Sequence, residues 1–256
     1  MLRCVTYLAA EDGEPGLPRS LFAEVVAGLE QKLSCRISLD VARCGSGPRA
    51  AADDAFAVGE FDLGWVCAPS MLWLHAQGSV DLVPASMVLD DPRCEGRGHY
   101  WCEVIVRERH RASRVDDLGG EVAAFNDRAS LSGFGSLLGR VDALGGQAYF
   151  GRWLETGSHA RSVCAVREGV ADVAAVDANV WRAMPQDGLR VLESLGPFPI
   201  QPMVVRRGAV DPARVAAALR SWCPAGQGMI RGFAPVSMSE ILDGVPWAAM
   251  QAAWRS

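Results

Sequence analysis

Hydrophobic and polar positions along the chain alternate between two spacings. Short runs rich in β-branched residues have the period of a strand, and stretches with apolar residues at helical spacing separate them. The chain opens with an expected strand over 3–8, a helix over 17–33 and a strand over 36–41. This order is typical of an α/β protein in which helices connect mostly parallel strands.

The same alternation continues to the end of the chain. The further expected helices are 49–58, 68–76, one from the loop 126–132 to about 143, 163–168, 179–184, 210–222 and a tail, 241–254, packed on the first lobe. The further expected strands are 61–66, 82–88, 100–106, 121–125, 172–176, one starting at 190 and one at 202–205. We expect a two-lobed α/β fold with mostly parallel sheets flanked by helices.

A polar, turn-rich segment over 90–98 separates the two sets of elements. It predicts a first lobe made of 1–95 and 206–256 and a second lobe made of 96–205. Strands crossing near 90–100 and 200–205 would form a hinge between the lobes. The length of 256 residues suits two such cores.

Composition excludes several classes of protein. Half of the residues are hydrophobic and 21% are charged, as in ordinary globular proteins. The net charge of -5 argues against a nucleic-acid partner, because such proteins normally carry a basic face. No run approaches the roughly 18 apolar residues of a membrane span. The N-terminus runs directly into a strand, so we expect a periplasmic protein if a leader has been removed and a cytoplasmic one if the chain is complete.

The eight cysteines are scattered and none forms a CxxC pair. Zinc sites normally show clustered spacing, so we expect no metal site and no cofactor. Most of these cysteines are expected to be buried small hydrophobes.

The most informative segment is Phe125–Gly135, with the sequence FNDRASLSGFG. A strand ends there and a helix begins near Ser130 or Ser132. Unpaired amides at a helix start carry a partial positive charge, and Gly133 lets a ligand approach the backbone. The segment is either an anion-binding loop or a helix cap without a ligand.

A second helix start follows at Thr156-Gly157-Ser158-His159. Its side chains add hydrogen-bond donors, and His159 in its charged form would stabilise an anion. The alternative is a structural histidine.

Asp177 lies just past the strand over 172–176. A carboxylate there would repel a fully ionised anion but accept a hydrogen bond from a ligand that bears a proton. Equally, Asp177 could cap the helix that begins near Asn179.

Further candidates are Trp65 and Ser70 in the first lobe and Tyr100, which lies just after the expected lobe boundary. Ser70 could meet a ligand from the opposite side, and the aromatic rings could pack over an organic substituent, with the Tyr100 hydroxyl as a polar contact. Aromatic residues at strand ends are also common core residues.

Hydrolase and ATPase motifs are missing from the sequence. There is no GxSxG, no GxxxxGK[ST] and no GxGxxG.

Several segments together carry a family resemblance: DLGWVCAPS, CEGRGHYWCEVIVR, DDLGGEVAAFNDRASLSGFGSL, TGSHARSVCAVREGVADVAAVDANVW and LRVLESLGPFPIQPMVV. Their order resembles the substrate-binding proteins of phosphate, phosphite and phosphonate ABC transporters, which have the type 2 periplasmic-binding fold. The resemblance spans roughly 5–233. It implies a solute-binding protein that captures a small oxyanion in an interlobe cleft, with an ABC permease as partner.

The resemblance also implies roles for individual residues. Ser130, Ser132 and Gly133 would hold the ligand oxygens together with His159, and Asp177 would accept from the ligand. Tyr100 would complete the closure of the cleft around the ligand. The family's usual Ser-Thr-Ser reads Ser130-Leu131-Ser132 here, one hydroxyl fewer.

A binding protein without chemistry of its own is the main interpretation. Two alternatives share the fold: a cytoplasmic enzyme similar to chorismate dehydratase, with His159 as base and Asp177 as acid, or a ligand sensor that signals to a partner protein.

Overall fold

The computed structural model describes residues 1–10, 15–42, 45–224 and 228–255. They form two compact units. Of the described residues, unit 1 comprises 1–10, 17–42, 45–100, 199–224 and 228–244, and unit 2 comprises 15–16, 101–198 and 245–255. The chain passes between the units within two long strands, β6 (His99–Arg107) and β10 (Leu189–Pro199), and again between Gly244 and Val245. None of the described helices is long and apolar enough to span a bilayer.

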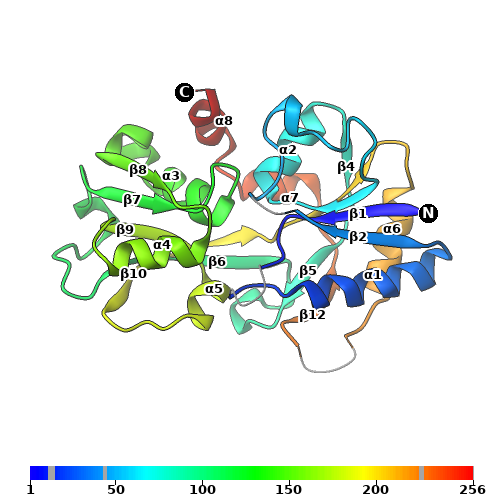
Figure 1. Cartoon of the computed structure of the whole chain (residues 1–256), viewed down its shortest axis with the longest axis horizontal. Coiled ribbons are helices and arrows are strands. Elements are labelled where there is room, and N and C mark those ends of the chain that lie inside the picture. The colour runs from blue at the N-terminus through cyan, green and yellow to red at the C-terminus, as the bar shows by residue number, and fades with distance from the viewer. Residues whose placement is uncertain (11–14, 43–44, 225–227, 256) are drawn as a thin grey trace. The chain divides into compact units, whose positions relative to one another are not determined.

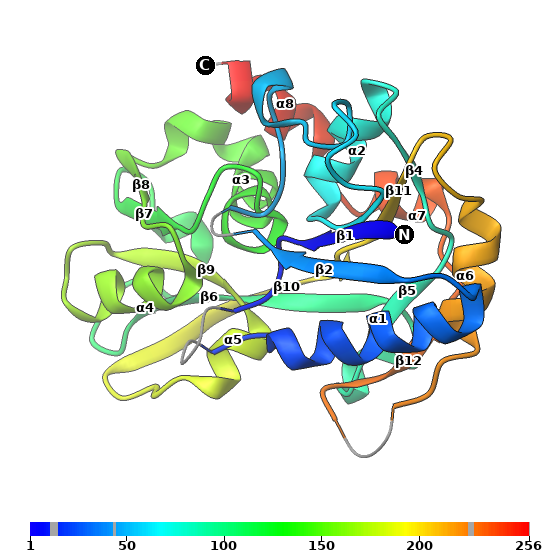
Figure 2. The same ribbon diagram turned by 45° about the vertical axis from the view of Figure 1, so that its right-hand side comes forward.

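Unit 1 contains a sheet in the order β2-β1-β3-β11-β4 and a β12-β5 pair. Its elements are β1 (Leu2–Thr6), α1 (Arg19–Leu33), β2 (Ile37–Val41), β3 (Leu63–Trp65), α2 (Ala68–Ala76), β4 (Val80–Leu82), β5 (Ser86–Leu89), β11 (Met203–Arg206), α6 (Pro212–Arg220), β12 (Ile230–Ala234) and α7 (Met238–Asp243). The strand β1 pairs in parallel with β2 and β3, whereas β11 pairs antiparallel with β3 and β4. The helix α1 runs alongside β2 and contacts α6 (Figure 2).

Unit 2 contains a sheet in the order β10-β6-β9-β7-β8. Its remaining elements are β7 (Val122–Phe125), a π-helical turn (Leu131–Gly135), α3 (Ser136–Arg140), β8 (Arg152–Glu155), α4 (His159–Arg167), β9 (Val173–Asp177), α5 (Ala178–Ala183) and α8 (Trp247–Arg255). The strand β7 pairs in parallel with β8 and β9, and β9 pairs antiparallel with β6. Both sheets are therefore more mixed than the sequence suggested.

The core of unit 2 lies on both faces of its sheet. Alternate residues of β9 point to opposite sides: Val173 and Ala175 join one buried cluster, and Ala174 and Val176 join the other. This alternation is the two-residue period of a strand buried on both faces. The helix α4 covers one face, with Val163 and Val166 in that cluster.

The sequence-based helix over 49–58 is wrong. Only a short 3-10 turn, Ala51–Asp53, forms there. The buried Asp54 carboxylate accepts hydrogen bonds from the amides of Phe56 and Ala57, and from the Ser79 hydroxyl. These bonds satisfy the local backbone in a turn and so compete with a helix.

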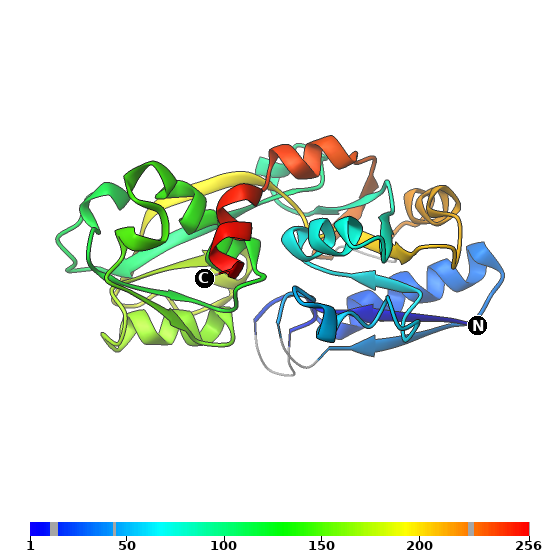
Figure 3. The ribbon, with the colours of Figure 1, turned by 90° about the horizontal axis from the view of Figure 1, so that it is seen from above.

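The tail also differs from expectation. It forms two helices, α7 and α8, because Pro246 interrupts the helical pattern. Residues 245–256 group with unit 2, not with the first lobe. Trp254 Nε1 donates to the Arg128 carbonyl at 2.8 Å, and Arg128 Nη1 donates to the Ala253 carbonyl at 3.1 Å. Figure 3 shows α8, in red, beside the green α3 region that it contacts.

Three smaller differences concern strands. Pro84 divides the expected strand over 82–88 into β4 and β5. The short strands β8 and β12 were not anticipated. The polar ends of β8, Arg152 and Glu155, are exposed, so its sequence lacks a continuous apolar run.

Trp254 provides a test of how α8 is attached. Replacing Trp254 with Phe keeps an aromatic ring but removes the indole donor to Arg128. We expect a loss of about 1 kcal/mol in unfolding free energy, measured by urea denaturation. Trp247→Phe, in the same helix and without an indole hydrogen bond to another described residue, is the control. Equal effects of the two substitutions would contradict this role.

Candidate functional site

Three helical segments of unit 2 begin at one edge of its sheet. The strands β7, β8 and β9 are mutually parallel, so their carboxyl ends meet there (Figure 1). The π-helical turn that leads into α3 follows β7, α4 follows β8 and α5 follows β9. Each start leaves backbone N–H groups without intrahelical acceptors and carries a partial positive charge. This edge is therefore suited to an anion.

Ser130 opens the first of these helical segments. Its side-chain oxygen accepts a hydrogen bond from the Gly133 amide at 3.1 Å, so it caps the helix. The turn Leu131–Gly135 is π-helical before α3 begins, a local geometry that is frequent at functional sites. The structure shows the cap, and the role of Ser130 as a ligand contact stays a prediction.

Ser132 and His159 come together from different helical segments. Ser132 Oγ lies 3.0 Å from His159 Nε2 and 3.5 Å from Ser130 Oγ. Ser132 is only 3% exposed. Residues that are 27 positions apart in the chain therefore form one connected polar group, which neither motif alone could establish.

The other donors at the start of α4 are engaged locally. Thr156 Oγ1 bonds to the Ser162 hydroxyl at 2.7 Å and to the Phe125 carbonyl at 3.0 Å. The Ser158 side chain caps α4 by accepting from the Arg161 amide. His159 is thus the side chain of this motif that faces the serine loop.

The protonation state of His159 differs from expectation. Burial lowers the pKa of His159 from 6.5 to about 4, so the ring is neutral near pH 7. Its Nδ1 is buried and has no hydrogen-bond partner among the described residues. His159 therefore acts as a neutral hydrogen-bonding group here rather than as the expected cation.

Gly133 allows an unusually close approach. A Cβ atom at this position would lie 1.8 Å from Asn126 Oδ1 and 3.2 Å from His159 Cε1. Any side chain here would force the Asn126 amide to move, so the close approach favours glycine. Sequence reasoning did not single out Asn126, because a polar residue after a strand is an ordinary loop residue.

Asp177 caps α5. Its Oδ1 accepts from the Asn179 backbone amide at 2.8 Å and from Asn179 Nδ2 at 3.0 Å. Burial raises the pKa of Asp177, although the hydrogen bonds from Asn179 oppose this shift. The capping alternative is what the structure shows, and a ligand contact by Asp177 stays a prediction.

The candidate residues of unit 1 lie in or next to its core. Trp65 is 1% exposed and packs edge-on against Phe22, with 5.3 Å between the ring centroids. Tyr100 is also buried. Ser70 lies in the first turn of α2, and its Oγ is buried without a hydrogen-bond partner in the described ranges. Ligand contacts by Trp65, Ser70 and Tyr100 stay predictions.

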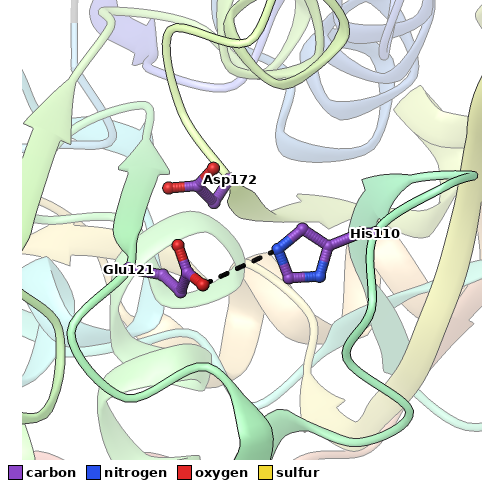
Figure 4. A group of neighbouring side chains, drawn as sticks. All are labelled: His110, Glu121 and Asp172. Carbon is purple, nitrogen blue, oxygen red and sulfur yellow. Dashed lines mark ion pairs between the residues drawn. The ribbon is translucent and has the colours of Figure 1, made fainter.

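A second polar cluster lies before the first residues of β7 and β9, and Figure 4 shows its side chains. It contains His110, Glu121 and Asp172, whose potential ligand atoms lie within 4.8 Å of one another. Glu121 and Asp172 come directly before β7 and β9, whose other ends bear the serine site.

The contacts of this second cluster fit an ion-pair network better than a cation site. Burial raises the pKa of Asp172, but hydrogen bonds from the Val122 amide and from Arg107 outweigh this and hold it below its usual range. His110 Nδ1 accepts from the Ala112 amide, so a neutral ring carries its proton on Nε2, which faces Glu121 at 3.9 Å. That proton occupies the position of the lone pair that a metal would need.

The two-unit α/β architecture and the polar group at the helix starts define a class of small-ligand binding proteins. Comparison with known families identifies the family of the chain. Residues 19–238 match the family described as "ABC transporter, phosphonate, periplasmic substrate-binding protein". The chain belongs to this family. No curated protein matches the sequence.

Solved structures support the same fold at low sequence identity. PhnD1 from Prochlorococcus marinus, in complex with methylphosphonate, superposes with a TM-score of 0.74 at 14% identity, covering 99% of this chain and 98% of that one. XAC2383 from Xanthomonas citri, bound to ATP, gives 0.73 at 17% identity, with coverage of 99% and 98%. A binding protein component of an ABC phosphonate transporter (PA3383) from Pseudomonas aeruginosa gives 0.69 at 14%, with 94% and 83%. These likenesses confirm the predicted fold class.

The titration of His159 can be measured directly. We expect its ring to protonate with a midpoint near pH 4 in the ligand-free protein, followed by NMR of the ring Cε1–H signal and assigned with His159→Gln. On acidification, this histidine binds a proton near pH 6.5 in the unfolded chain but only near pH 4 in the folded protein. The contribution of the neutral ring to the free energy of unfolding is therefore fully present above pH 6.5 and is lost as the pH falls towards 4. A midpoint near 6.5 would contradict the desolvated environment.

The close approach at Gly133 predicts the effect of one methyl group. Gly133→Ala forces the Asn126 amide to move, and we expect a loss of roughly 1–3 kcal/mol in unfolding free energy. Gly119→Ala is the matched control in unit 2, because the nearest atom to its Cβ would be a Tyr149 ring carbon at 3.5 Å. Unchanged stability of Gly133→Ala would show that the site tolerates a side chain.

Proposed function

We propose that the chain captures a small phosphonate-, phosphite- or phosphate-like oxyanion and delivers it to an ABC permease, without catalysing a reaction. The observation that carries this proposal is the Ser132–His159 pair at an edge where three helical segments begin. Family membership supports the transport role. The methylphosphonate bound by PhnD1 supports the ligand class.

The physical basis for binding is a set of neutral donors and helix dipoles. Hydrogen bonds to a charged ligand contribute about 1.5–3 kcal/mol each, roughly twice the value between neutral groups. Ser132 can turn its hydroxyl from His159 to a ligand oxygen. His159 can then donate from a ring nitrogen, and a nearby anion would raise its pKa above that of the ligand-free state.

The geometry favours binding over catalysis. The enzyme alternative requires His159 as base and Asp177 as acid. The low pKa of His159 makes it a weak base, and Asp177 Oδ1 is engaged by Asn179 as a helix cap. The described part of the chain shows no hydrogen bond between His159 and Asp177. Neither residue is thus prepared for proton transfer, which supports a solute-binding role.

Titration calorimetry tests the function. Phosphate, phosphite, methylphosphonate and 2-aminoethylphosphonate are titrated into the protein, and we expect saturable binding of at least one of them. Ser132→Ala should weaken that binding by at least about tenfold, because it removes one hydrogen bond to a charged ligand worth about 1.5–3 kcal/mol. The control is Ser113→Ala, an exposed serine of unit 2. If none of the four binds at millimolar concentration, the proposal is wrong.

A further inference from the structure

Asn126 is a buried polar residue of unit 2, and its side-chain oxygen has no hydrogen-bond partner among the described residues. It follows the last residue of β7 and is 8% exposed. Its backbone carbonyl accepts from the Gly157 amide at 2.9 Å, which links the serine loop to the loop before α4. The backbone is therefore fixed between the two helix starts of the candidate site, and the side chain projects from this position.

The orientation of the Asn126 amide is set by its neighbour. Nδ2 donates to Asp127 Oδ2 at 2.9 Å, and a carboxylate can only accept, so the nitrogen must face it. The opposite atom, Oδ1, is buried and receives no hydrogen bond from any described residue. Buried acceptors are rarely left unpaired, because they have lost their water without a replacement. Oδ1 is thus an acceptor in need of a donor.

Oδ1 faces the candidate oxyanion site. A Cβ built on Gly133 would lie 1.8 Å from Oδ1 and 3.2 Å from His159 Cε1, so both groups lie on the same side of this glycine. His159 Nδ1 is the other unpaired buried atom beside this glycine, and it makes no hydrogen bond to Asn126. The unpaired Oδ1 of Asn126 therefore lies beside Gly133, the residue that follows Ser132, and the unpaired Nδ1 belongs to the ring that meets Ser132 through Nε2.

The cations near this site bond to other groups: Arg182 Nη2 donates to Asn179 Oδ1, and the Arg128 guanidinium lies over the Phe134 ring. Asp127 adjoins Asn126, and the Asp177 cap lies at the same sheet edge. Arg128 donates to the Ala253 carbonyl in α8, and no described arginine or lysine bonds to the side chain of Asn126 or His159. Ser132, His159 and the helix starts can stabilise other ligand oxygens, but a ligand oxygen without a proton at Oδ1 would meet only its lone pairs, whereas a ligand hydroxyl could donate to them.

Given the oxyanion function proposed above, on which this inference rests, we propose that Asn126 Oδ1 is a specificity-determining acceptor for a hydrogen on the ligand. It selects the singly protonated form of a phosphonate-type oxyanion over an anion of the same shape that carries no proton. A site built to pair a ligand hydroxyl rejects an analogue that lacks it, because its own acceptor is then left unpaired.

Methylphosphonate and methanesulfonate distinguish an anion that carries a proton from one that does not. They have similar shape, and at neutral pH only the phosphonate retains an acidic proton in part of its population. Calorimetry at pH 6.5 should show wild-type protein binding methylphosphonate at least about tenfold more tightly than methanesulfonate. Asn126→Leu should bring the ratio of the two dissociation constants close to one, mainly by removing the repulsion of the sulfonate. Asn126→Ala should do the same without adding bulk.

Controls distinguish this role from a structural one. Ser132→Ala removes a donor that either ligand uses, so it should weaken both and leave their ratio unchanged. A general loss of fold in an Asn126 variant would also weaken both together, and thermal melting identifies it. Wild-type protein should bind methylphosphonate progressively more weakly as the pH rises and the ligand loses its proton.

Three results bear on the inference differently. Equal affinity of wild-type protein for the two anions would overturn the role of Asn126 while leaving oxyanion binding intact. A preference for methylphosphonate that survives in both Asn126 variants would also overturn it, assigning the selection to another residue. Failure of wild-type protein to bind either anion, or any of the phosphorus oxyanions, would instead refute the proposed function.

Discussion

Parallel pairing of β7 with both β8 and β9 is the constraint on which the rest of the site depends. Strands that run in the same direction end at the same edge, and the segments after them must turn back over the sheet as helices. Three helix starts are therefore brought together by the sheet before any side chain is considered. Ser132 and His159 meet because they occupy the first turns of two of these helical segments.

Burial then sets the chemistry of the groups at this edge. It keeps His159 neutral near pH 7 and raises the pKa of Asp177. Among the described residues named at this site, none is a buried arginine or lysine that could balance the negative charge of a ligand. An anion at this site would therefore be stabilised by dipoles and hydrogen bonds rather than by a formal positive charge. The acidic net charge of the chain does not oppose such binding, since these contacts act only at short range.

The sequence was sufficient for the order of most elements, because the buried strands and amphipathic helices carry clear periods. It failed where local side-chain bonds compete with periodicity, as at Asp54, and where a strand such as β8 lies at an edge with polar ends exposed. It also assigned the tail to the wrong unit. The contact between Trp254 and Arg128 joins residues that are 126 positions apart, and no local pattern encodes such a contact.

For the site, the sequence could identify helix starts and polar residues but not which of their groups were already engaged. Ser130 and Asp177 proved to be caps, a possibility that the sequence left open. The desolvation of His159 and the unpaired oxygen of Asn126 depend on three-dimensional packing, so they emerged only from the structure.

The most direct test of the account is a crystal structure of the protein with methylphosphonate. We expect the phosphonate group at the carboxyl edge of β7 and β8, with one oxygen within 3.2 Å of Ser132 Oγ and another within that distance of a ring nitrogen of His159. A ligand bound elsewhere, with the Ser132–His159 hydrogen bond unchanged, would contradict the central claim that these helix starts form the anion site.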